Sequence, residues 1–286
     1  MQIAVASGKG GTGKTTIALN LAYTASQQGK AVQYLDCDVE EPNGHLFLRP
    51  EIEETRTVGM PVPEVDESKC TGCGLCREIC QYNAITCFNK MVLVFPELCH
   101  GCGGCVLVCP ENAIAEKSRE VGVIEAGMAN QIEFVHGKLR IGEAMSPPLI
   151  REVKKQITAG YINIIDVPPG TSCPVITAIQ GADLVLLVTE PTPFGLNDLD
   201  LALDMVNELG LLYGVVVNRH EAGNNSARDF CKKKGAPILA EIPDDRRVAE
   251  AYSIGKLAVE TMPEYDRHFT KLWIKIKKRA NNTTIR

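Results

Sequence analysis

The chain of 286 residues is long enough for one large α/β domain or two smaller ones, and its 45% hydrophobic and 23% charged residues are typical of a globular protein. A formal net charge of −5 gives no sign of bulk nucleic-acid binding, so we expect no nucleic-acid partner. No apolar run reaches the roughly 18 residues of a membrane span, and the start lacks the features of a signal peptide, so we expect a cytoplasmic protein.

The first elements of the chain predict a parallel sheet. Gln2–Ala6 is a short apolar strand, and a glycine-rich loop follows it. Thr15–Gln28 has apolar residues at helical spacing and ends at Gly29, a natural C-cap, and Ala31–Leu35 is a second buried strand. The order strand, loop, helix, strand is typical of an α/β fold.

The middle of the chain, residues 59–118, is rich in Cys, Gly and Pro and contains an internal repeat. Nine residues recur in register, which indicates two copies of one small unit. The residues Cys70, Gly72, Cys73, Gly74, Cys76, Cys80, Asn83, Ala84 and Ile85 recur as Cys99, Gly101, Cys102, Gly103, Cys105, Cys109, Asn112, Ala113 and Ile114.

After about residue 119 the α/β alternation resumes. Val121–Ala126 and Gln131–Val135 predict a hairpin, and Pro148–Ala159 predicts a helix. Buried strands are predicted at Tyr161–Asp166, Leu184–Thr189, Tyr213–Val217 and Pro237–Ala240. Strands on both sides of the repeat thus belong to one sheet. We therefore predict a discontinuous α/β domain with a mostly parallel sheet, residues 1–58 and 119–286, around an inserted small α+β domain, residues 59–118.

The loop after the first strand matches the phosphate-binding pattern G-x-x-x-x-G-K-[ST] in its required place between a strand and a helix. Its glycines allow backbone N–H groups to face phosphate oxygens. Lys14 is expected to reach the β- and γ-phosphates, and the Thr15 hydroxyl is expected to bind Mg²⁺. The loop also matches the dinucleotide pattern G-x-G-x-x-G, which leaves Lys14 and Thr15 unexplained. The loop residues are Gly8, Lys9, Gly10, Gly11, Thr12, Gly13, Lys14 and Thr15.

With its additional lysine, the segment from Lys9 to Thr16 resembles the deviant Walker A motif of the MinD/ParA/Mrp family, to which the nitrogenase iron protein also belongs. The resemblance implies that the whole segment, Thr16 included, binds ATP with Mg²⁺. It also implies an ATP-dependent dimer, either a homodimer or a heterodimer with a similar subunit, in which Lys9 reaches the partner's nucleotide. Catalytic roles are implied for Lys9, Lys14, Asp38 and Asp166.

Three positions outside the loop resemble motifs of the same family. Asp38, just after the second strand, resembles the switch I aspartate that orients the attacking water. Asp166 resembles the switch II aspartate, which supports Mg²⁺ from outside the ring of its direct ligands. Asn218 resembles the adenine-binding asparagine. The alternative for each is a carboxylate or amide that caps a helix or turn.

The eight cysteines of the repeat have the spacing of bacterial ferredoxins with two [4Fe–4S] clusters, in which the fourth ligand of each cluster comes from the other run. Zinc is the alternative, but zinc sites favour two Cys-x-x-Cys pairs. Gln81 stands where many ferredoxins have proline, a change that removes no ligand. The expected ligands are Cys70, Cys73, Cys76 and Cys109 for the first cluster and Cys99, Cys102, Cys105 and Cys80 for the second.

The remaining cysteines are expected to be packed side chains, namely Cys37, Cys87 and Cys231. Cys173 lies seven residues after Asp166, the spacing of the dimer-bridging cluster ligand in the nitrogenase iron protein. Packing at a helix start is the favoured interpretation of Cys173, and a bridging cluster is the alternative.

The end of the chain predicts an amphipathic helix with an apolar stripe and several lysines. A membrane-surface helix of this kind is possible, but docking of the stripe on the sheet is favoured. The stripe consists of Phe269, Leu272, Trp273 and Ile276.

Taken whole, the chain resembles MinD-superfamily ATPases that carry an inserted ferredoxin domain. We favour an ATP-gated electron-transfer protein, because a nucleotide switch and a redox module share one chain; its electron donor and acceptor proteins are unknown. The alternatives are an Mrp-type carrier or assembly ATPase for iron–sulfur clusters, and a MinD- or ParA-like positioning ATPase with structural or sensing clusters.

Overall fold

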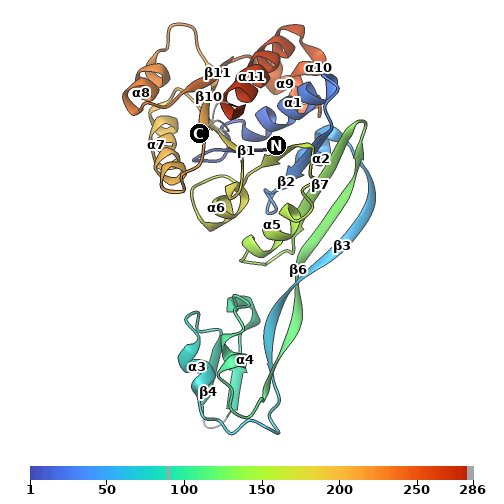
Figure 1. Ribbon diagram of the computed structural model, residues 1–286, viewed down its shortest axis with the longest axis vertical. Coiled ribbons are helices and arrows are strands. Elements are labelled where there is room, and N and C mark those ends of the chain that lie inside the picture. The colour runs from blue at the N-terminus through green and yellow to red at the C-terminus, as the bar shows by residue number, and fades with distance from the viewer. Residues whose placement is uncertain (89–90, 282–286) are drawn as a thin grey trace.

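The computed structural model describes residues 1–88 and 91–281 (Figure 1). Its main element is a nine-stranded sheet in the order β11-β10-β9-β1-β8-β2-β7-β6-β3. Strands β11 to β7 run parallel, whereas β6 and β3 are antiparallel to their neighbours. The strands are β1 (Gln2–Ala6), β2 (Val32–Asp36), β3 (Glu51–Val65), β4 (Ile85–Phe88), β5 (Met91–Val94), β6 (Ile114–Ala129), β7 (Ile132–Leu139), β8 (Ile162–Asp166), β9 (Leu184–Thr189), β10 (Tyr213–His220) and β11 (Ile238–Pro243).

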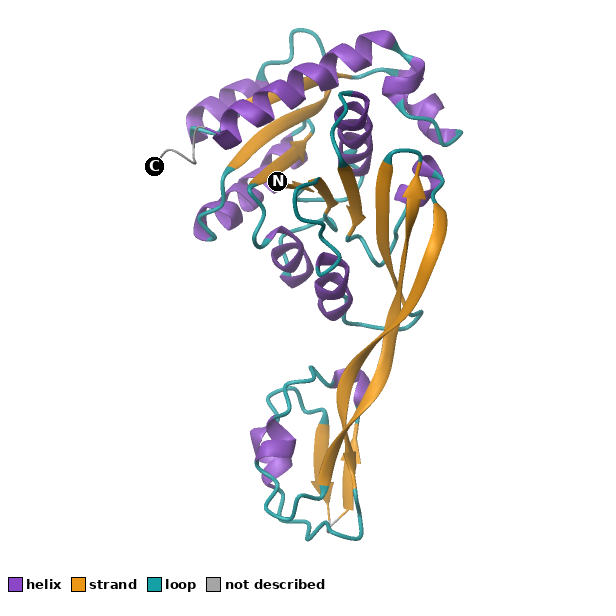
Figure 2. Ribbon diagram, turned by 45° about the vertical axis from the view of Figure 1, so that its right-hand side comes forward, coloured by secondary structure: helices purple, strands orange, loops and turns teal. Residues whose placement is uncertain are grey.

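Helices cover both faces of the parallel part of the sheet (Figures 1 and 2). On one face, α1, α10 and α11 bury side chains such as Ile17 and Phe269. On the other, α5 to α8 bury side chains such as Leu149 and Leu199. The predicted α/β fold with a mostly parallel sheet is thus confirmed. The helices are α1 (Lys14–Gln27), α2 (Gly44–Leu48), α3 (Leu75–Ile79), α4 (Gly104–Leu107), α5 (Pro147–Lys154), α6 (Cys173–Ile179), α7 (Pro193–Glu208), α8 (Ser226–Lys234), α9 (Arg246–Ser253), α10 (Ala258–Thr261) and α11 (Pro263–Asn281).

The apolar stripe of α11 lies inside the protein. Phe269, Leu272, Trp273 and Ile276 are each at most 1% exposed, and α11 packs against α1. The favoured interpretation, docking of the stripe on the sheet, is therefore confirmed. We call the parallel part of the sheet, with the helices that cover it, the body. Among the described residues, no helix is both long and apolar enough to cross a membrane.

The cysteine-rich residues lie at the far end of a long two-stranded ribbon that β3 and β6 form as they leave the body (Figure 2). We call residues 66–113 the cysteine unit; they contain α3, α4 and the small antiparallel sheet of β4 and β5.

The ribbon strands were not predicted at their full length. Val58, Met60 and Val62 alternate as buried residues, but Pro61 and Pro63 between them weaken the strand signal. These prolines are tolerated because β3 is an edge strand, and an N–H group on the side facing away from β6 needs no partner strand. The predicted boundaries of the inserted domain at residues 59 and 118 fall within the two strands, close to an irregularity in pairing between Val58 and Gly59. They remain a prediction.

Candidate nucleotide and cysteine sites

The glycine-rich loop connects the carboxyl end of β1 to the start of α1. Gly11 and Gly13 have φ values of +80° and +85°, which side chains rarely adopt. A Cβ on Gly13 would lie 2.2 Å from the Nδ2 atom of Asn218, and that same amide donates a hydrogen bond to the Thr12 carbonyl over 2.8 Å. The conformation of the loop and its contact with β10 thus both require glycine.

A cavity of about 500 Å³ opens beside this loop and extends toward α9. Among the predicted nucleotide-binding residues, Gly8, Thr12 and Asp166 do not line the cavity; Asp166 is fully buried behind it. The predicted residues that line it are Lys9, Gly10, Gly11, Gly13, Lys14, Thr15, Thr16, Asp38 and Asn218.

The side chain of Lys14 is 7% exposed and lies among carboxylates. Its Nζ atom is 2.8 Å from Asp166 Oδ1 and 3.5 Å from Asp38 Oδ2. Burial lowers the pKa of Lys14, but the negative charges of Asp166 and Asp38 more than offset this, so the pKa is raised. Burial also raises the pKa of Asp38, to about 6, despite the nearby ammonium. The structure therefore brings together the lysine and both switch aspartates.

Two residues of this network were not assigned a role from the sequence. The Tyr34 hydroxyl donates to Asp166 Oδ2 over 2.9 Å. The fully buried Asp36 accepts backbone hydrogen bonds from Asp38, Asn43 and Gly44 at 3.0 to 3.2 Å. The Asp-x-Asp pair at the end of β2 was a usable signal, because one carboxylate of such a pair can hold the turn while the other faces the ligand.

Lys9 lies at the rim of the cavity, where its Nζ atom is 3.6 Å from Glu190. Arg219 contacts the same carboxylate at 2.5 Å. The Lys9 side chain is about one-third exposed, and the Ser7 hydroxyl donates to the Lys9 carbonyl over 2.8 Å. Its predicted reach to a partner's nucleotide stays a prediction.

The residues around the cavity fit a nucleotide with Mg²⁺. Gly10 and Gly11 donate no backbone hydrogen bond to any described residue, so their N–H groups are free for phosphate oxygens. The Lys14 ammonium supplies the positive charge, and the Thr15 hydroxyl and nearby carboxylates are oxygen ligands of the type that Mg²⁺ prefers.

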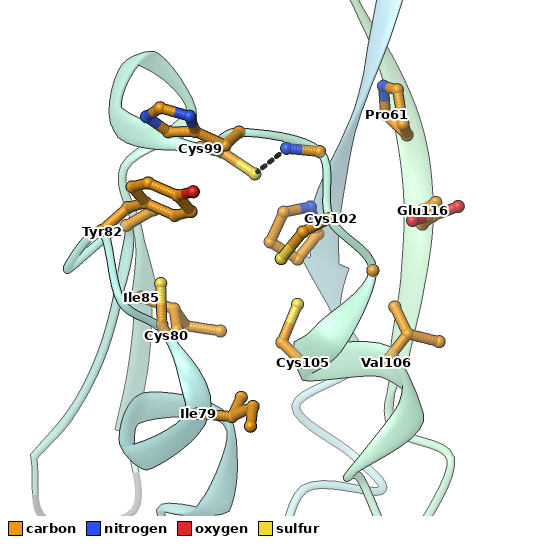
Figure 3. Close-up of a pocket in the computed structure, with 15 residues that line it drawn as sticks. Pro61, Ile79, Cys80, Tyr82, Ile85, Cys99, Cys102, Cys105, Val106 and Glu116 are labelled. Carbon is orange, nitrogen blue, oxygen red and sulfur yellow. Dashed lines mark hydrogen bonds between the residues drawn. The ribbon is translucent and has the colours of Figure 1, made fainter. Parts of the chain in front are cut away.

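The eight predicted cysteine ligands line two cavities in the cysteine unit, four in each. Figure 3 shows one cavity, with the sulfur atoms of Cys80, Cys99, Cys102 and Cys105 around it. The other cavity is lined by Cys70, Cys73, Cys76 and Cys109. Each cavity thus takes three cysteines from one run and the fourth from the other run, which is the predicted exchange.

The loops around both cavities have the same backbone geometry. Gly72, Gly74, Gly101 and Gly103 all have φ between 65° and 84°, and Asn83 and Asn112 have φ of 53° and 50°. Backbone N–H groups point at sulfur atoms: Gly101 donates to Cys99 at 3.4 Å and Ala113 donates to Cys109 at 3.3 Å. The two copies of the repeat therefore share their backbone conformation as well as their sequence.

The four thiols of each set surround a cavity instead of meeting at one point. Within residues 1–88 and 91–281, no group of three or more Cys, His, Asp or Glu side chains could hold a single metal ion. Outside the two sets, Cys37 and Cys231 are buried, and Cys87 lies near the Gly72 carbonyl. Cys173 stands at the start of α6 but is exposed, so the favoured interpretation of a packed side chain is wrong there.

A phosphate loop between a strand and a helix, with a buried lysine facing two strand-end aspartates, defines a P-loop nucleotide-binding protein. Residues 3–258 match the family described as the CobQ/CobB/MinD/ParA nucleotide binding domain. The chain belongs to this family and is a P-loop ATPase of the MinD/ParA/Mrp type.

Relatives and solved structures agree with this assignment. An uncharacterized protein of Methanocaldococcus jannaschii is 35% identical, with 97% of this chain and 96% of that protein covered. An iron–sulfur cluster carrier protein of Pyrococcus abyssi is 24% identical, with 89% and 77% covered. The fold is similar to that of the septum site-determining protein MinD of Pyrococcus horikoshii complexed with Mg-ADP, with a TM-score of 0.62 and 22% identity over 97% of this chain and 96% of that one.

Proposed function

We propose that this ATPase is an iron–sulfur protein in which nucleotide-driven switching of a dimer controls electron transfer through two [4Fe–4S] clusters in the cysteine unit. The observation that carries the proposal is the grouping of eight cysteines around two cavities, four to each, at the end of a ribbon rooted in the ATPase body. When bound, such clusters supply one-electron chemistry at potentials set by their surroundings.

The residues of the nucleotide site have separate tasks in this proposal. Lys14 binds the β- and γ-phosphates, while Thr15 and Asp166 hold Mg²⁺. Because Lys14 now contacts Asp166 and Asp38, a bound phosphate would draw its ammonium away from both carboxylates. Asp38 is then free to orient the attacking water and accept its proton. Asn218 holds the loop through its hydrogen bond to the Thr12 carbonyl, and its remaining donor and acceptor positions bind the base.

The cysteine unit supplies built sites for the clusters. Glycines with positive φ let the loops wrap each cavity, and N–H groups of Gly101 and Ala113 stabilise negative charge on sulfur. Four full ligands at each site favour permanently held clusters. Lys9 completes the proposal by joining two copies, or this chain and a similar subunit, around ATP.

The carrier function is the second candidate, and the similarity to iron–sulfur cluster carrier proteins favours it. In support, Cys73 and Cys102, one cysteine of each set, are exposed. A positioning ATPase is less well supported, because the apolar stripe of α11 is buried against the body.

Iron quantification and cluster transfer separate these functions. We expect anaerobically purified protein to hold about eight iron atoms per chain and to keep them when mixed with an apo-ferredoxin and ATP. Release of iron to the apo-ferredoxin on ATP hydrolysis would support the carrier instead. Less than about one iron atom per chain after anaerobic reconstitution would reject both cluster functions.

A further inference from the structure

The segment after Asp38, the predicted switch aspartate, is hydrogen-bonded to the carboxyl end of β7. The Val39 carbonyl accepts a hydrogen bond from the Leu139 N–H group over 2.9 Å. The Val39 side chain also packs against the backbone of Gly137, where an added Cβ would lie 2.7 Å from Val39 Cγ1. One residue later, the Glu40 carboxylate accepts from the Ser146 hydroxyl at 3.0 Å. A movement of Asp38 therefore acts on both ends of the loop formed by residues 139–146.

That loop is attached in turn to the ribbon. Arg119 of β6 binds the Glu143 carboxylate through both terminal nitrogens, at 2.5 Å and 3.2 Å. The Glu143 side chain is buried at 1% exposure, and the Arg119 side chain is largely buried at 13%. Arg140 adds a backbone bond to the Val121 carbonyl at 2.9 Å. A bidentate, desolvated ion pair fixes distance and orientation, unlike an exposed one.

The ribbon then contacts the loop that carries Cys99 to Cys105. A Cβ on Gly101 would lie 3.1 Å from both the Met60 side chain and the Pro61 carbonyl, and one on Gly103 would lie 3.3 Å from the Glu116 carboxylate. Pro61 and Glu116 line this cavity from the ribbon side (Figure 3). Glu116 is three residues before Arg119, which is about 10 Å along a strand.

We propose that Arg119 and Glu143 are positioning residues that transmit the nucleotide state from Asp38 and Val39 to the second cysteine cavity. The proposal rests on the nucleotide switching in the proposed function, but not on electron transfer. The contacts run without interruption from switch segment to loop, from loop to β6, and from β6 to the cysteine loop. Among the described residues, the ion pair of Arg119 with Glu143 is the one that joins β6 to the loop of residues 139–146.

The test is hydrogen–deuterium exchange of the iron-loaded full chain with ADP and with a non-hydrolysable ATP analogue. We expect the analogue to change exchange in residues 99–105 and 114–120 by roughly fivefold or more. Arg119→Met should abolish this change, while analogue affinity and iron content stay within a factor of about two. Lys117→Met is the matched control, because Lys117 lies on the same strand and pairs with Glu64 in solvent, 65% and 61% exposed. It should keep the change.

Glu143→Gln is a second variant in case Arg119→Met does not fold, because the amide oxygen can still accept the Met145 N–H bond. It should also abolish the nucleotide-dependent exchange. The proposal is overturned if both variants retain the change, or if the wild-type exchange in these residues does not respond to nucleotide. Exchange that responds through Arg119 without any shift in cluster potential would keep the proposal and reject ATP-controlled electron transfer.

Discussion

The ATPase body and the cysteine unit are stabilised in different ways. The body buries long apolar side chains on both faces of its sheet, and strands such as β9 are buried at every residue. The cysteine unit has a small cluster, in which its Cys76 and Ile85 pack with Ile114, the first residue of β6. It exposes large apolar side chains instead, including Phe88 at 73% and Leu107 at 85%. In the proposed function, bound clusters would supply much of the stability that so small a core does not provide.

Removal of iron should affect the stability of the two regions most differently. With chelator under anaerobic conditions, we expect the cysteine unit to unfold and become sensitive to protease between residues 66 and 113. The body should keep its sheet and unfold at a nearly unchanged temperature, because almost all residues of its core lie outside the cysteine unit. Limited proteolysis and circular dichroism on the same sample would show this. A protease-resistant, iron-free cysteine unit would contradict the account.

Lys14→Ala should affect the body without affecting the unit. We expect ATP hydrolysis to fall roughly 100- to 1,000-fold, because the charge that stabilises the transferring phosphate is lost. Iron content should not change. Steady-state hydrolysis and iron assays measure both, and Lys69→Ala, an exposed lysine of the cysteine unit, serves as control. Equal loss of activity in the two variants would rule out a specific role for Lys14.

Leu272→Ala tests the packing of α11. The variant should lower the free energy of unfolding of the body by about 2–5 kcal/mol, because Leu272 is fully buried between α11 and the sheet. Iron content and vesicle binding should be unaffected. Denaturant unfolding and co-sedimentation with anionic vesicles are the measurements. Unchanged stability with reduced vesicle binding would revive a membrane role for the helix.

The smallest expected effect concerns Asp36. Burial, together with the nearby Asp166 carboxylate, raises the pKa of Asp36 to about 8. A carboxyl group with a raised pKa contributes stability at low pH that is lost as pH rises through that value. Without nucleotide or Mg²⁺, the wild-type melting temperature should therefore fall between about pH 4 and pH 8 more than that of Asp36→Asn, which cannot ionise. Parallel pH profiles would show that Asp36 does not titrate in this range.

Much of the body could be predicted from the sequence because each element has a local signal. The strand at Gln2–Ala6 and the glycine loop carry their own patterns, and so does the amphipathic α11. The predicted helix Pro148–Ala159 was too long: α5 ends at Lys154, and Thr158 instead binds the Gln33 side chain. That contact joins residues far apart in the chain, so no local pattern could reveal it.

The same reason explains what was missed at the sites. The cysteine spacing predicted which thiols would share a cavity, because the exchange of the fourth ligand is built into the repeat. Tyr34 could not be predicted, since its role depends on pairing of β2 with β8, which places its hydroxyl beside Asp166. The ion pair of Arg119 and Glu143 likewise depends on how the ribbon leaves the sheet.

If nucleotide state and redox state are linked, the midpoint potentials of the clusters should depend on the bound nucleotide. We would measure them with ADP and then with a non-hydrolysable ATP analogue, in the wild type and in Lys14→Ala. We expect a shift of about 59 mV or more, a tenfold change in a one-electron equilibrium, and we expect Lys14→Ala to abolish it. Potentials that are the same with both nucleotides would contradict this expectation.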